Sequence, residues 1–114
     1  MSAITTHVLD TARGRPAASV PVTLEFRTAE SGWKMLGHGK TDADGRAKDL
    51  LPVSAHLEAG VYRLRFDTAT YFRAQSIDSF HPEVTIEFAV RNAAQHYHIP
   101  LLISPYSYTT YRGS

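Results

Sequence analysis

Residues 96–103, HYHIPLLI, contain the alternation that decides the fold. Side chains along a β-strand point in turn to opposite faces of the sheet. One face of this segment is wholly apolar and consists of Tyr97, Ile99, Leu101 and Ile103. We therefore expect a half-buried strand whose apolar face lies in the core, with His98 on the other face.

Similar patterns occur outward from this strand along the rest of the chain. The further segments predicted as strands are 4–9, 20–27, 33–40, 61–67, 84–90 and 106–112. Only residues 68–75 favour a helix, because Asp67 or Thr68 can cap it and no glycine or proline interrupts it. Short, regularly spaced strands with one short helix predict an all-β fold, an antiparallel β-sandwich.

Composition limits the class of protein. A length of 114 residues with 43% hydrophobic and 20% charged residues fits one folded domain, which we expect to span residues 1–114. Lys and Arg number 12 against 11 Asp and Glu, so no basic field is present to attract nucleic acid or a membrane surface. Without cysteine, disulfides, thiolate metal sites and thiol nucleophiles are excluded. The lack of an apolar leader or long apolar run predicts a cytoplasmic protein.

Two histidines stand on faces that the alternation places outside the core. His98 is one, and His7 is the other, because it points away from Val8. Each has apolar neighbours on its own face, Leu9 beside His7, and Pro100 and Leu102 following His98. Imidazole titrates near neutral pH and suits proton transfer from water. Two interpretations stay open: ordinary surface histidines, or site histidines in a cleft that a second subunit covers.

Other candidate motifs give weaker signals. Residues 41–45, TDADG, predict a tight turn and lack the acidic spacing of a calcium-binding EF-hand. Arg46, just after the turn, is either solvated or a clamp for an oxyanion or a urea-like substrate. His96 and His98 could chelate in principle, but no zinc motif supports them and we expect no metal. Gly-rich phosphate loops and the GxSxG elbow are absent from the sequence.

The C-terminal tail is unusually aromatic for a frayed end. Residues 104–114, SPYSYTTYRGS, follow a predicted strand directly. Parity allows Tyr111 to join the outer-face histidines. The alternative is an edge strand whose tyrosines pack on their neighbour.

Three stretches carry a resemblance to a known family. THVLDTARGRPA at 6–17, TDADGR at 41–46 and HYHIPLLISPYSYTTYRGS at 96–114 resemble the transthyretin-related 5-hydroxyisourate hydrolases of urate degradation. The ending YRGS is the most specific part. The resemblance implies a transthyretin-like sandwich of two four-stranded sheets with one short helix. It further implies a homotetramer, a dimer of dimers, with active sites in the channel between the dimers.

The resemblance also implies a reaction and the roles of individual residues. Water attacks a ring carbonyl of 5-hydroxyisourate, and the six-membered ring opens to 2-oxo-4-hydroxy-4-carboxy-5-ureidoimidazoline without a cofactor. His7 and His98 would position and deprotonate the water, while Arg46 would bind the substrate and stabilise the oxyanion. Tyr111 would hold the substrate, and the Ser114 carboxylate would orient a histidine or Arg46.

Two other functions fit the same fold. One is a transthyretin-type carrier that binds an aromatic hormone and performs no chemistry, although imidazoles are out of place in an apolar carrier channel. The other is a structural module of a larger assembly, which the ending at YRGS without a linker makes the weaker expectation.

Overall fold

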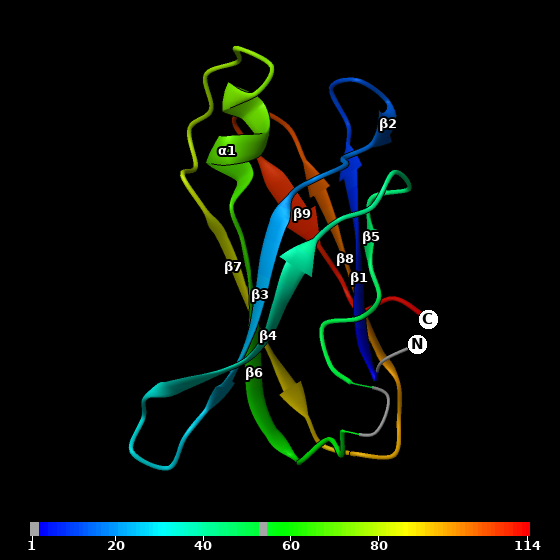
Figure 1. Ribbon diagram of the computed structural model, residues 1–114, viewed down its shortest axis with the longest axis vertical. Coiled ribbons are helices and arrows are strands. Elements are labelled where there is room, and N and C mark those ends of the chain that lie inside the picture. Colours follow the sequence, from blue (N-terminus) through cyan, green and yellow to red (C-terminus); the bar gives the residue numbers. More distant parts are fainter. Residues whose placement is uncertain (1–2, 53–54) are drawn as a thin grey trace.

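The computed structural model of the chain describes residues 3–52 and 55–114, which form two β-sheets and one short helix (Figure 1). One sheet has the strand order β4-β3-β6-β7. Its strands are β3 (Pro21–Arg27), β4 (Trp33–Lys40), β6 (Gly60–Phe66) and β7 (Val84–Val90). The other sheet has the order β2-β1-β8-β9, with β5 also paired to β1. Its strands are β1 (Ile4–Asp10), β2 (Arg15–Pro16), β5 (Arg46–Ala47), β8 (Tyr97–Ile103) and β9 (Tyr108–Thr110). The predicted two-sheet sandwich with one short helix is confirmed.

Strand pairing departs from the expected antiparallel pattern at one position. β1 and β8 pair in parallel along their whole lengths, whereas the other pairings are antiparallel. A parallel pair requires a crossover between its strands, and here the chain between β1 and β8 builds the whole opposite sheet. The expected second four-stranded sheet has five strands, because the two-residue strands β2 and β5 both attach to β1. Neither short strand is long enough to show an alternation.

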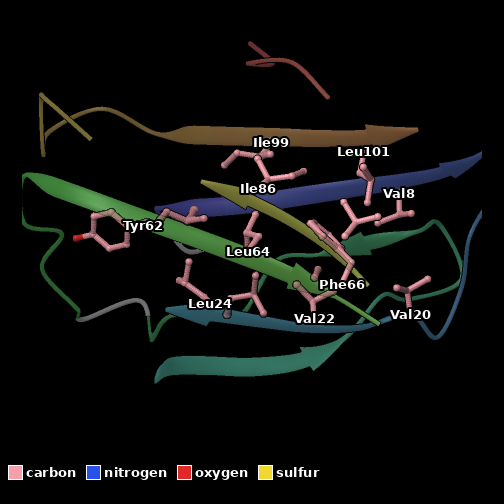
Figure 2. Close-up of a cluster of buried hydrophobic side chains, with 14 of the residues drawn as sticks. Val8, Val20, Val22, Leu24, Tyr62, Leu64, Phe66, Ile86, Ile99 and Leu101 are labelled. Atoms are coloured by element: carbon pink, nitrogen blue, oxygen red, sulfur yellow. The ribbon is translucent and has the colours of Figure 1, made fainter. Parts of the chain in front are cut away.

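The core lies between the two sheets and follows the predicted parity. Figure 2 shows side chains of both sheets filling this space. The fully buried ones include Val8, Leu24, Leu64, Phe66 and Leu101. Each such side chain contributes about 1.5–3 kcal/mol by leaving water. Because this burial fixes which residues point inward, the alternate residues on β1 and β8 must point away from the core.

Helix α1 (Thr68–Arg73) connects β6 to β7, which are neighbours in one sheet, at one end of the sandwich. Its N-cap is Asp67, whose carboxylate accepts a hydrogen bond from the Thr70 amide at 3.1 Å. The hydroxyl of Tyr71 donates to buried Asp10 at 2.7 Å, which ties the helix to the end of β1. The predicted helix is confirmed, two residues shorter at its C-terminal end. Over the described ranges, no helix combines the length and the apolar character needed to cross a membrane.

The turn before β5 is fastened to β1. The Asp42 carboxylate accepts hydrogen bonds from the amides of Asp44 and Arg46, at 2.9 and 3.0 Å. Gly45 has a φ of +78°, and its carbonyl oxygen accepts a 2.7 Å hydrogen bond from the Val8 amide. A Cβ at Gly45 would collide with the carbonyl oxygen of Val8. The backbone therefore requires glycine at the position directly before Arg46.

Replacing Gly45 by alanine should lower the free energy of unfolding by more than the ~1–2 kcal/mol that a left-handed alanine costs, because the methyl group also meets Val8. Gly14→Ala is the matched control, since Gly14 has a φ of +68° and an added Cβ would meet nothing within 4 Å. Urea denaturation of both variants measures the two losses. Equal losses would show that the turn makes room for the methyl group.

Candidate active site

The outer face of the sheet β5-β1-β8 gathers the polar residues that the sequence singled out. His7 on β1 lies opposite Arg46 on β5 and opposite Pro100 on β8. One step along the same face, Thr5 lies opposite His98. Directly opposed residues on paired strands have Cβ atoms about 4.5–5.5 Å apart. The predicted residues His7, Arg46 and His98 are therefore brought to one patch on three adjacent strands.

The ring of His7 is held by the turn that also carries Arg46. His7 Nε2 lies 2.8 Å from the carbonyl oxygen of Asp44. A carbonyl oxygen can only accept, so Nε2 donates the proton in this hydrogen bond. In the neutral ring, Nδ1 then keeps a free lone pair. One short turn thus sets both the tautomer of His7 and the position of Arg46.

His98 is half-buried and is held from the neighbouring strand. Its Nδ1 lies 2.8 Å from the hydroxyl oxygen of Thr5, which leaves Nε2 as the ring nitrogen available to a substrate or water. Burial lowers the pKa of His98 below its ordinary value of 6.5, and the Arg46 guanidinium and the neighbouring rings of His96 and His7 lower it further. His98 is therefore neutral near pH 7 and able to accept a proton.

The C-terminal tail lies against His98, as expected if the tail belongs to the site. The Gly113 amide donates to the His98 carbonyl oxygen at 2.8 Å, in a bridge beyond the end of β9. A Cβ on Gly113 would come within 2.7 Å of the His98 ring. Arg112 stacks on the Tyr97 ring, with 4.5 Å between the guanidinium carbon and the ring centroid. Ser114 follows Gly113 directly, so the chain end lies next to the strand that carries His98.

Two hollows are each lined in part by a residue of the patch. His98 lines a cavity of about 210 Å³ together with Tyr111 and Glu87. Arg46 lines another cavity of about 330 Å³ together with Asp42. Tyr111 is 58% exposed, and its role toward a substrate stays a prediction. In a single chain, His98 and Arg46 share a patch but open into separate hollows.

His96 and His98 face the same hydroxyl group. His96 Nε2 lies 3.1 Å and His98 Nδ1 2.8 Å from Thr5 Oγ1. Among residues 3–52 and 55–114, no three His, Cys, Asp or Glu side chains form a group able to hold a metal ion. Strand parity puts Thr5 on the same outer face as His7, but nothing in the sequence gives it a role. Only the parallel register of β1 and β8 would have revealed it.

Fold and patch together define a class of protein: a transthyretin-like β-sandwich that carries two imidazoles and a guanidinium on the exterior of one sheet. A neutral imidazole can take a proton from water, and a guanidinium can stabilise a negatively charged oxygen. Sequence comparison narrows this class. The chain belongs to the HIUase/Transthyretin family, whose model matches residues 4–113.

Individual relatives cover nearly the whole chain. A 5-hydroxyisourate hydrolase of Caulobacter vibrioides is 47% identical over 118 residues and spans all of both chains. The structure of Klebsiella pneumoniae 5-hydroxyisourate hydrolase matches with a TM-score of 0.86 and 34% identity over the whole of each chain. Sea bream transthyretin in complex with thyroxine matches with a TM-score of 0.90 and 36% identity, covering 96% of this chain and 93% of its own. The fold is thus shared by proteins named as enzymes and by a protein bound to thyroxine.

Arg46→Met should raise the pKa of His98 toward 6.5, because it removes a nearby positive charge. NMR titration of the His98 ring measures the shift, and Arg27→Met, at an exposed position in the opposite sheet, is the matched control. As the pH falls, His98 in the unfolded chain binds a proton at a higher pH than His98 in the folded protein does, because folding lowers the pKa of this ring. The contribution of His98 to the free energy of unfolding therefore falls as pH falls through this range, and less so in Arg46→Met. An unchanged His98 midpoint in Arg46→Met would contradict this account.

Proposed function

We propose that this protein, acting as one domain over residues 1–114, hydrolyses 5-hydroxyisourate in urate degradation. The observation that carries the proposal is the convergence of His7, Arg46 and His98 on the outer face of one sheet, with the C-terminal tail against His98. Relatives named 5-hydroxyisourate hydrolase, 42–47% identical to this chain, support the choice of substrate.

The arrangement suits attack of water on a ring carbonyl. His98 Nε2 takes a proton from water as the water oxygen bonds to the carbonyl carbon, and Arg46 stabilises the oxyanion that forms. His7 orients the water through its free Nδ1. Collapse of the oxyanion breaks the ring C–N bond, and the proton passes to the leaving nitrogen. The product is 2-oxo-4-hydroxy-4-carboxy-5-ureidoimidazoline, and the reaction calls for water alone and no cofactor.

We also propose that the site is completed in a homotetramer, a dimer of dimers. Leu9 and Leu102 are half-buried apolar residues on the same outer face as the histidines. A second sheet covering this face would bury them and would enclose His98 and Arg46 in one channel. Tyr111 would hold the substrate there, and the Ser114 carboxylate would orient a histidine or Arg46. Lack of cysteine suits the reducing cytoplasm, where we place the protein.

A carrier is the second candidate, because sea bream transthyretin has this fold and was solved with thyroxine. The patch favours the hydrolase. A carrier needs apolar contact along its channel, whereas this face presents imidazoles and a guanidinium.

His98→Asn should slow ring opening about 10²- to 10⁴-fold, the usual contribution of a general base. The decay of freshly generated 5-hydroxyisourate, followed by ultraviolet absorbance against its spontaneous hydrolysis, gives the rate. His56→Asn, at an exposed loop position, is the control and should keep wild-type activity. An unchanged rate in His98→Asn removes this residue from the mechanism. A wild-type protein that does not accelerate the decay overturns the hydrolase proposal in favour of a carrier or scaffold.

Deleting Ser114 should lower the rate about tenfold or more, a change of ~1.4 kcal/mol in barrier, because the terminal carboxylate moves back to Gly113. Ser114→Ala is the matched control, since it keeps a carboxylate in place and loses only the hydroxyl. Sedimentation velocity reports whether both variants remain tetrameric. A truncated protein that is tetrameric and fully active has no catalytic need of this carboxylate.

A further inference from the structure

The hydroxyl of Thr5 is shared by two histidine rings. Thr5 Oγ1 lies 2.8 Å from His98 Nδ1 and 3.1 Å from His96 Nε2. Thr5 is only 4% exposed, so these rings are its neighbours in place of solvent. Of these three residues, the mechanism proposed above uses only His98 and gives Thr5 and His96 no part.

A threonine hydroxyl has one hydrogen, so it can donate to only one of the two rings. In one arrangement, His96 Nε2 donates to Thr5, Thr5 donates to His98 Nδ1, and His98 carries its own proton on Nε2. In the other arrangement, His98 Nδ1 donates to Thr5 and Thr5 donates to His96 Nε2. His98 Nε2 then has a free lone pair. The two tautomers of His98 thus correspond to the two directions of one hydrogen-bonded chain.

We propose that Thr5 and His96 act as a proton relay for His98, which rests on the hydrolase function proposed above. As His98 Nε2 takes a proton from the attacking water, the proton on Nδ1 passes to Thr5 Oγ1. The Thr5 hydroxyl proton passes to His96 Nε2, whose ring carries its other proton on Nδ1 and becomes an imidazolium. When the ring C–N bond breaks, the chain reverses. His98 Nε2 gives its proton to the leaving nitrogen, and His96 returns to neutral.

The relay has an electrostatic reason. A positive charge on His98 would be half-buried and close to Arg46, His96 and His7, all of which disfavour it. In the single chain His96 is exposed, so water solvates its charge. The two rings are nearly parallel, at 17°, with centroids 6.5 Å apart. The relay therefore moves the positive charge from His98, whose surroundings disfavour it, to the ring of His96, whose centroid is 6.5 Å away.

Thr5→Val tests the hydroxyl, because valine keeps the shape of threonine and is favoured in strands. We expect kcat for 5-hydroxyisourate to fall tenfold or more, with KM and the unfolding midpoint near wild-type values. Thr5→Ser restores a hydroxyl without the methyl group and should recover most of the rate. If Thr5→Ser loses as much as Thr5→Val, the methyl packing matters and the relay is wrong.

His96→Gln tests the far end of the relay and is independent of how well Thr5→Val folds. The side-chain amide of the introduced glutamine can donate a hydrogen bond to Thr5 but cannot take up a proton. We expect kcat to fall as in Thr5→Val, and the double variant to be no slower than either single one, because both break the same chain. His56→Gln is the matched control at an exposed loop histidine. Wild-type kcat in His96→Gln overturns the relay.

Nitrogen NMR of the His98 ring supplies a readout that packing alone does not move. In Thr5→Val the ring should change its tautomer balance, whereas Thr5→Ser should match the wild type. An unchanged balance in Thr5→Val counts against the relay. These outcomes are separable from a failure of the hydrolase proposal, which would appear as a wild-type protein without activity.

Discussion

The parallel register of β1 against β8 is the constraint on which the rest of the structure depends. It sets Thr5 opposite His98 and His7 opposite Pro100, while the alternate residues of both strands fill the core. A slip of one residue would turn every side chain of β1 to the other face. Because Ile4 and Val8 are fully buried, such a slip would expose apolar core and bury the imidazole of His7. Burial in the core thus protects the geometry of the exterior patch.

The sequence predicted the features that depend on residues close together in the chain. The outward direction of His7 and His98, the apolar face of β8, the turn before Arg46 and the helix after Asp67 are all confirmed. The pairing of Thr5 with His98 could not be predicted, since these residues are 93 positions apart and meet only through the parallel crossover. The short strands β2 and β5 were missed because two residues cannot show a period.

The shared fold does not decide between chemistry and transport, because the same sandwich matches a hydrolase of Klebsiella pneumoniae and a transthyretin bound to thyroxine. The difference lies in the side chains on one exterior face. Here that face carries titratable groups whose hydrogen-bond partners are a backbone carbonyl and a buried hydroxyl. The carbonyl fixes the tautomer of His7, whereas the hydroxyl can donate to or accept from His98. Both properties matter for moving protons and have no use in binding an apolar ring.

The turn at residues 42–45 has a consequence for how this site can diversify. The carbonyl of Asp44 holds the ring of His7, and the carboxylate of Asp42 holds the amide of Arg46, so this one turn sets the spacing between the imidazole and the guanidinium. An insertion or deletion in this loop would move Arg46 and the carbonyl that holds the His7 ring, while β1 and β8 keep the backbones of His7 and His98 in register. Loop length would then set the distance from the Arg46 guanidinium to the imidazole of His98, whereas Ala43, at the exposed tip of the turn, makes neither of these contacts.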